Sequence, residues 1–136
     1  MKTVIFDTNV LLDLFIFNDF RVLHIKQALI DRQLDVLASW PTIAEFTEVI
    51  SRPLFNLDQS AQEKIVQEWQ SLARIIDTQN ITTAPWQCRD NDDQIFLDLA
   101  YTAKPCFLLS KDNEVLKLAS RAAKEAVIIT ADYTSL

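Results

Sequence analysis

The chain has 136 residues, none of which is glycine, and carries a net charge of −6. The missing glycine excludes P-loops, dinucleotide-binding fingerprints, the nucleophile elbows of α/β-hydrolases and EF-hand loops, because each of these sites needs glycine at fixed positions. The apolar fraction of 49% and the charged fraction of 24% are typical of a globular protein, and we expect a single domain spanning residues 1–136.

Cysteine and histidine are too few for a zinc site of the usual kind, because the chain contains only Cys88, Cys106 and His24. The two cysteines are either small buried hydrophobes or a disulfide pair, and we favour the first because nothing marks the chain as secreted. Asp7 and Asp13 interrupt the apolar N-terminus, and no apolar stretch is long enough to span a membrane. We therefore expect a cytoplasmic protein that does not bind membranes.

Two strands and a helix are predicted in the first third of the chain. Residues Lys2–Phe6 and Asp35–Ser39 are short, continuous apolar runs, which are typical of strands covered on both faces in a parallel sheet. Pro41 fits the first turn of a helix whose apolar positions continue to Ile50. Pro53 then ends this helix or follows its end.

A second helix is predicted after residue 59. Ser60 can cap its N-terminus, with Glu63 three residues later as the partner in a capping box. Apolar residues at helical spacing continue from Ile65 to Ile76 and include Trp69. We therefore expect Trp69 in the core and not as a platform on which bases stack.

Two further helices and two further strands are predicted in the last third. Helical stripes cover Ile95–Ala100 and Val115–Ala119, and continuous apolar runs cover Cys106–Leu109 and Ala126–Thr130. Strands that alternate with helices predict a three-layer α/β/α sandwich with a mostly parallel central sheet. In such folds the working site lies beyond the carboxyl ends of the strands.

Carboxylates from four separate segments are expected at that edge of the sheet. Asp7 follows the first strand, Glu45 lies on the helix after the second, Asp93 opens a later helix, and Asp112 follows the third predicted strand. Carboxylate oxygens suit Mg²⁺ or Mn²⁺. Without a cation the acids would repel one another and some of their pKa values would rise.

Each acid also has a purely structural explanation. Asp7 and Asp112 can cap the helices that follow them. Asp93 suits the positive end of a helix dipole, and Glu45 can be an ordinary surface residue. Because the structural alternative requires four coincidences, we favour a shared metal site.

Four motifs in order resemble those of PIN-domain ribonucleases. They are VIFDTNVLLD (Val4–Asp13), TIAEFTEVISRPLF (Thr42–Phe55), CRDNDDQIFLDLA (Cys88–Ala100) and LLSKDNEVLKLA (Leu108–Ala119). The resemblance spans nearly the whole chain and extends to the toxin components of bacterial type II toxin–antitoxin pairs. It implies a PIN-like fold and a hydrolase that cleaves phosphodiester bonds.

The resemblance implies that Asp7, Glu45, Asp93 and Asp112 are the catalytic, metal-binding acids. The third acid is ambiguous, because Asp90, Asp92 and Asp93 lie together. We prefer Asp93, whose register with the apolar positions of its helix fits the family pattern, and Asp92 is the alternative. The expected supporting polar groups are Thr8, Asn9, Ser110 and Glu48, the last of these one helical turn from Glu45.

A basic segment is the expected RNA-binding rim. Residues 104–124 contain five basic and two acidic residues, a local net charge of +3. Its candidate RNA-contacting side chains are Lys104, Lys111, Lys117 and Arg121. The alternative is an ordinary solvated helix face. Lys104-Pro105 and Lys111 stand where the family usually has glycine, which affects the substrate path more than metal binding.

The leading hypothesis is a Mg²⁺- or Mn²⁺-dependent endoribonuclease that cleaves single-stranded RNA. The resemblance implies that it is a toxin, neutralised by an antitoxin, and a homodimer; the apolar run Leu14–Phe17 then serves either partner binding or core packing. The alternatives are a catalytically silent PIN-like binding module and an RNA-processing nuclease that is not a toxin. A phospho-acceptor role for Asp7 is disfavoured, because the residues after it lack the D-x-D arrangement of such phosphatases.

Overall fold

The computed structural model describes residues 1–136. Its strands are β1 (Lys2–Phe6), β2 (Leu34–Ser39), β3 (Arg74–Ile76), β4 (Cys106–Leu109) and β5 (Val127–Thr130). They form one sheet in the order β3-β2-β1-β4-β5, and every neighbouring pair is parallel. The helices are α1 (Thr8–Phe15), α2 (Leu23–Ile30), α3 (Trp40–Ile50), α4 (Gln59–Leu72), α5 (Asn91–Ala103), α6 (Asn113–Leu116) and α7 (Ala119–Ala123).

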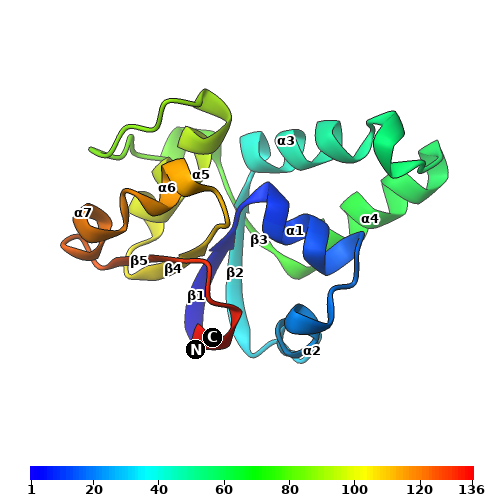
Figure 1. The fold of residues 1–136 in the computed structure, drawn as a ribbon, viewed down its shortest axis with the longest axis horizontal. Helices are drawn as coiled ribbons and strands as arrows, with labels where there is room; N and C mark the ends of the chain where they lie inside the picture. Colours follow the sequence, from blue (N-terminus) through cyan, green and yellow to red (C-terminus); the bar gives the residue numbers. More distant parts are fainter.

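Helices cover both faces of the sheet, with α1 to α4 on one face and α5 to α7 on the other (Figure 1). Alternate residues of β1 show the division. Val4 and Phe6 pack in the cluster formed with α1 to α4, whereas Ile5 packs in the cluster formed with α5 to α7. A strand buried on both sides needs apolar residues at every position, which explains its continuous pattern. The predicted three-layer α/β/α sandwich is confirmed.

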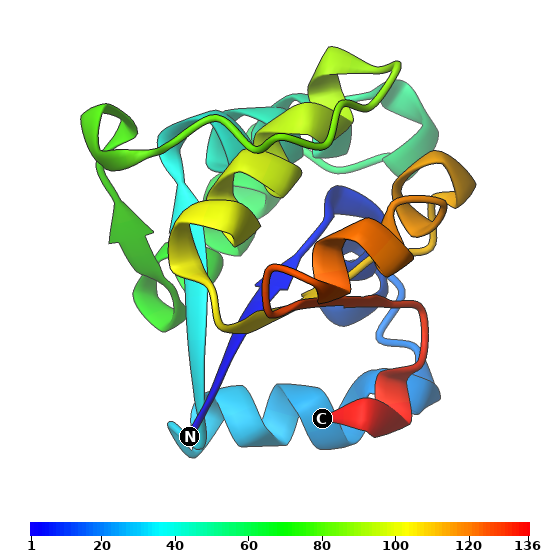
Figure 2. The ribbon, with the colours of Figure 1, turned by 90° about the vertical axis from the view of Figure 1, so that its left-hand side faces the viewer.

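Because all the strands are parallel, their carboxyl ends lie together on one side of the sheet and their amino ends on the opposite side. The carboxyl ends of all five strands meet at one edge, called here the carboxyl edge, and their amino ends meet at the amino edge. Both chain termini lie at the amino edge near α2, and Lys2 Nζ donates to the Ser135 carbonyl there (3.1 Å) (Figure 2). The carboxyl edge is therefore free of the chain ends.

Four predicted strands are confirmed, and one strand was missed. β1 and β4 have the predicted bounds, while β2 and β5 each differ by one residue at the start. The missed strand is β3, whose Ile76 was assigned to the preceding helix. This short edge strand pairs only with β2, through partners such as Ile75 and Ala38. Such pairing is a tertiary contact that no local pattern reveals.

The predicted start and end of α4 were wrong. Asp58, not Ser60, caps the helix, and its Oδ1 accepts from the Ala61 backbone N–H (2.8 Å). The helix ends at Leu72, before β3. Asp and Ser are equally good N-caps, so residue type alone gave no reason to prefer Ser60 over Asp58.

The last helical region also differs from its prediction. The stripe at Val115–Ala119 predicts one helix, but the structure has two short ones, α6 and α7, separated near Leu118. Val115, Leu118 and Ala122 are all buried against the second face of the sheet. The apolar pattern therefore located the buried side chains but not the break between the helices. The helix predicted at Ile95–Ala100 is confirmed as part of α5.

Core predictions for aromatic and cysteine residues are confirmed with one refinement. Trp69 is 1% exposed and packs between Phe6 and Phe15, with ring centroids 6.1 and 5.9 Å away. The cysteines form no disulfide; Cys106 is buried, and Cys88 is only partly buried. Of the apolar run at the end of α1, Leu14 and Phe15 are buried in the core, Ile16 is partly buried and Phe17 is 59% exposed.

Positions that usually need glycine are filled by other residues. Asn18, Arg32, Asn56 and Ala126 adopt positive φ angles between 46° and 60°. Asparagine tolerates this left-handed region best, whereas alanine and arginine are disfavoured there. None of the helices is both long and apolar enough to cross a membrane.

Candidate active site

Asp7 is the first residue beyond β1 and is 4% exposed. Its backbone N–H donates to the Leu109 carbonyl (3.0 Å), which extends the β1–β4 pairing by one bond. Its Oδ1 accepts from the Val10 backbone N–H (3.0 Å) and caps α1. The capping role considered for Asp7 is real, but it uses only one of the two carboxylate oxygens.

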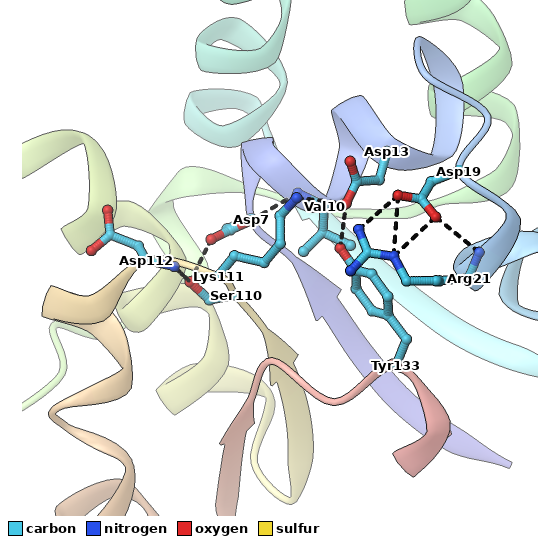
Figure 3. Close-up of polar contacts among 9 residues, drawn as sticks. All are labelled: Asp7, Val10, Asp13, Asp19, Arg21, Ser110, Lys111, Asp112 and Tyr133. Carbon is cyan, nitrogen blue, oxygen red and sulfur yellow. Dashed lines mark hydrogen bonds and ion pairs between the residues drawn. The ribbon is translucent and has the colours of Figure 1, made fainter.

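The second oxygen of Asp7 is bound by Ser110, which follows β4 (Figure 3). The Ser110 hydroxyl donates to Asp7 Oδ2 and accepts from the Asp112 backbone N–H (3.1 Å). Ser110 is fully buried, and its own N–H donates to the Thr130 carbonyl (3.1 Å). The predicted supporting group Ser110 therefore joins two neighbouring strands to the first acid.

Glu45 reaches the same edge from α3. This helix begins directly after β2, where Ser39 and Thr42 form a capping box with each other. Glu45 lies one turn later and is partly buried, and its Oε2 accepts a hydrogen bond from the Thr8 hydroxyl. The structure therefore brings Thr8, at the start of α1, to the second acid.

These side chains line a pocket of about 260 Å³ at the carboxyl edge. Five of its lining residues are acidic, and Arg52 is the only basic one. The complete lining is Asp7, Thr8, Asn9, Glu45, Val49, Arg52, Asp90, Asp92, Asp93 and Phe96. The first three sequence motifs thus converge on one strongly acidic cavity, as expected.

The pKa values of the pocket acids show that their negative charges are poorly compensated. Burial raises the pKa of Asp7 from 3.8 to about 6, although the hydrogen bonds from Ser110 and the Val10 backbone oppose this change. Burial, together with the charges of Asp112, Asp90 and Asp7, raises the pKa of Asp93 to about 7. Burial also raises the pKa of Glu45. A bound cation would relieve this repulsion.

Asp93 is the best placed of the three neighbouring acids. Asp90 caps α5 by accepting from the Asp92 backbone N–H (2.9 Å), and both of these residues are exposed. Asp93 is partly buried, and its pKa responds to the charges of Asp7 and Asp112. All three acids line the pocket, so the assignment of the third acid to Asp93 stays a proposal.

Asp112 is near the pocket but does not line it. Its Oδ1 accepts from the Glu114 backbone N–H (2.7 Å) and caps α6, and its carboxylate points away from Asp7 in Figure 3. No group of three or more Asp, Glu, His or Cys side chains is arranged to hold one metal ion. The oxygen donors suit a hard divalent cation, but the side chains as they stand do not form its ligand sphere.

Glu48 and Arg52 form an ion pair at the end of α3, and only Arg52 lines the pocket. The expected supporting residue Glu48 is exposed and outside the pocket, where its Oε2 accepts from Arg52 Nη2 (2.8 Å). Arg52, which was not predicted as a site residue, lines the pocket. Its position just after α3, in the arginine–proline part of the second motif, was the available signal.

The predicted basic rim is only partly at the site. Lys104 precedes β4 and therefore lies at the amino edge, away from the pocket, where it pairs with Glu125 (3.4 Å). Lys117 pairs with Glu114 (2.8 Å), and Arg121 is exposed on α7. Lys111 does lie beside the pocket acids, but its ammonium binds Asp13 (2.6 Å). The segment is thus not one continuous cationic surface facing the acids.

Comparison with known proteins identifies the family. The family model described as PIN domain matches residues 3–114. A chain in the crystal structure of VapBC2 from Rickettsia felis, bound to a DNA fragment from its promoter, superposes with a TM-score of 0.63 at 12% sequence identity, over 94% of this chain and 97% of the other. No curated protein sequence matches. With a family model covering most of its length and a five-stranded parallel sheet that presents acids at its carboxyl edge, this chain belongs to the PIN-domain family.

Proposed function

We propose that the protein is a Mg²⁺- or Mn²⁺-dependent endoribonuclease that cleaves phosphodiester bonds in single-stranded RNA. The observation that carries the proposal is the acidic pocket, in which the buried Asp7 and the partly buried Asp93 have strongly raised pKa values. Such a pocket repels RNA until a cation neutralises it. Membership of the PIN family supports the same activity.

Asp7, Glu45, Asp93 and Asp112 are the residues that would hold the cation. Bound there, the cation would neutralise charge on the phosphate and lower the pKa of a water molecule for attack on phosphorus. Ser110 and Thr8 keep Asp7 and Glu45 in place through their hydroxyl hydrogen bonds. These hydrogen bonds favour the ionised carboxylates, which are the forms that bind metal.

Arg52 is the side chain best placed to contact the substrate phosphate. It is the only basic residue that lines the pocket, and its guanidinium is held by Glu48 at the rim. Arginine binds phosphate with two parallel N–H donors, which fixes the orientation of the phosphate. We assign Asn9, an exposed lining residue, to contacts with the same part of the RNA.

The direct test compares cleavage of a labelled single-stranded RNA by the wild type, Asp7→Asn and a control, Asp77→Asn, with Mg²⁺ or Mn²⁺. Asp77 is exposed outside the pocket. We expect cleavage by the wild type and the control, about 10³-fold slower cleavage by Asp7→Asn, and no cleavage in EDTA. Equal rates for all three proteins, or activity that survives EDTA, would contradict the proposal.

We further propose that the nuclease is the toxin of a toxin–antitoxin pair, held inactive by a small antitoxin. The support is the resemblance of the four motifs to such toxins and the shared fold with a chain of a VapBC2 structure. Exposed Phe17, which packs on Phe55, and exposed Leu54 offer apolar surface for a protein partner, either the antitoxin or a second copy. Growth arrest on expression, lost in Asp7→Asn and relieved by the neighbouring gene, tests this role; no arrest would leave an RNA-processing nuclease.

A second candidate is a PIN-like binding module without activity. The observation in its favour is that no three acids are arranged around a common point. Calorimetry with Mn²⁺ separates the two functions. Binding that disappears in Asp7→Asn supports the nuclease, whereas an absence of binding to the wild type supports the silent module.

A further inference from the structure

A buried carboxylate outside the acidic pocket has two strong partners. Asp13, on α1, is 4% exposed, and its Oδ2 accepts from Lys111 Nζ (2.6 Å) and from the Tyr133 hydroxyl (2.6 Å). Tyr133 lies in the 3₁₀ turn Tyr133–Ser135 that follows β5, and its ring lies 5.6 Å from the Arg21 guanidinium. Figure 3 shows these side chains beside Asp7 and Ser110. Residues from three distant parts of the chain thus meet at one oxygen.

This ion pair is unlike the others in the protein. In each of the five other ion pairs, one side chain is at least 36% exposed and the other is at least 19% exposed. The Asp13 side chain is only 6% exposed. Exposed pairs contribute little to stability, and a buried pair recovers its desolvation free energy only with good geometry and further hydrogen bonds. Tyr133 supplies that further hydrogen bond.

The location of Lys111 gives the pair a specific consequence. Lys111 lies between Ser110, which donates to Asp7, and Asp112, the fourth predicted acid. Two successive residues of the loop after β4 therefore bind α1 or its N-cap. Ser110 binds the cap Asp7, and Lys111 binds Asp13, nearly two helical turns further along. The Lys111–Asp13 bond is thus a second side-chain contact between this loop and α1, in addition to the Ser110–Asp7 bond.

We propose that Lys111 is a positioning residue, whose bond to the Asp13–Tyr133 pair holds the Ser110–Asp112 loop in register with Asp7. This inference rests on the proposed metal-dependent nuclease function and reassigns Lys111, which the sequence had suggested as an RNA contact. Lys111 acts through Ser110 and Asp112 and touches neither the phosphate nor the metal.

The test uses the full chain and five variants: Lys111→Met, Lys111→Arg, Asp13→Asn, Tyr133→Phe and the double variant that combines Asp13→Asn with Lys111→Met. Lys64→Met is the matched control, because Lys64 is exposed on α4 and forms no ion pair. We measure kcat and KM for single-stranded RNA, and Mn²⁺ affinity by calorimetry. Urea unfolding reports whether each variant is folded under these conditions.

We expect Lys111→Met to lower kcat and Mn²⁺ affinity each by about 10- to 100-fold, with KM for RNA nearly unchanged, since residues that orient ligands have effects of this size. Lys111→Arg restores most of the loss. Asp13→Asn with Lys111→Met is no worse than Asp13→Asn alone, because both remove the same bond. Tyr133→Phe has a smaller effect, and Lys64→Met has none.

Each remaining outcome overturns the inference in a recognisable way. A raised KM, an unchanged kcat and a weaker salt dependence would make Lys111 an RNA contact. If the loss of kcat and of Mn²⁺ affinity equals the fraction of each variant that is unfolded under the assay conditions, as calculated from urea unfolding, the ion pair is merely structural. If the wild type binds Mn²⁺ but cleaves no RNA, the nuclease proposal fails. In that case the Mn²⁺ affinity of Lys111→Met still tests the positioning role, and an affinity equal to that of the wild type overturns it. If the wild type binds no Mn²⁺, both proposals fail.

Discussion

The two edges of the sheet use charged residues in opposite ways. At the carboxyl edge, five acids and one arginine line the pocket, and the pKa values of Asp7 and Asp93 are raised. At the amino edge, charges are paired with opposite partners, as in Lys104 with Glu125. One edge therefore holds like charges together at the expense of stability, and the other neutralises them. We expect substitutions at the carboxyl edge to change activity, and those at the amino edge to change stability alone.

The largest expected effect distinguishes acids within the carboxyl edge. Asp93→Asn is expected to lower kcat about 10²- to 10³-fold, whereas Asp92→Asn, one residue away and more exposed, is expected to lower it less than about 10-fold. The reason is that Asp93 is partly buried and close enough to Asp7 and Asp112 for their charges to raise its pKa. Single-turnover cleavage of RNA with Mn²⁺ measures both variants. A larger loss in Asp92→Asn would transfer the third-acid role to that residue.

The next effect is a pH dependence of stability in the absence of divalent cations. Because the pKa of Asp7 is about 6 in the folded protein and near 3.8 when unfolded, the folded state binds more protons between these values, and stability falls as pH rises from about 4 to about 6. For the buried Asp7 the loss is about 3 kcal/mol. Asp93 extends the decline to about pH 7.

Urea unfolding between pH 4 and pH 8 in EDTA measures this decline. Asp7→Asn removes most of it and is more stable than the wild type at pH 8, because asparagine keeps the helix cap without the buried charge. Saturating Mn²⁺ binds the folded state and so makes the free energy of unfolding of the wild type less dependent on pH. Stability that is independent of pH over this range would show that the carboxyl edge stores no unfavourable charge.

A smaller effect is expected from the only basic residue of the pocket. Arg52→Ala should raise KM for RNA about 10-fold through loss of a phosphate contact, with a smaller change in kcat. Glu48→Gln, which weakens the ion pair that holds Arg52, should lower KM. Steady-state kinetics at two salt concentrations would detect both changes. If both variants have the KM of the wild type, Arg52 does not contact the substrate.

The smallest effect is expected at the amino edge. Ala126 has a φ of 60° in the turn before β5, and glycine adopts this conformation without the steric penalty of a Cβ. Ala126→Gly should raise the free energy of unfolding by about 1 kcal/mol and leave kcat and KM unchanged. Asn56→Gly is the control, since asparagine already tolerates its φ of 51°. A change in activity of Ala126→Gly would break the separation between the two edges.

Local patterns in the sequence were sufficient for most of the fold. Continuous apolar runs identified β1, β2, β4 and β5, because a strand with both faces covered cannot accept polar positions. They failed at β3, which is short, lies at the sheet edge and has partly buried apolar residues. They also failed at the start of α4, where Asp58 and Ser60 compete as caps. In both cases a long-range contact, or a choice between equal local options, decided the outcome.

For the site, the sequence by itself determined which residue types follow which strands, and parallel strands then bring Asp7, Glu45 and Asp93 to one pocket. Only the tertiary structure decided how individual side chains are used. It placed Arg52 among the acids that line the pocket. It also joined Lys111 to Asp13, 98 residues away. Such pairings depend on which groups meet after folding, because hydrogen bonds and ion pairs act over a few ångströms in space and not along the chain.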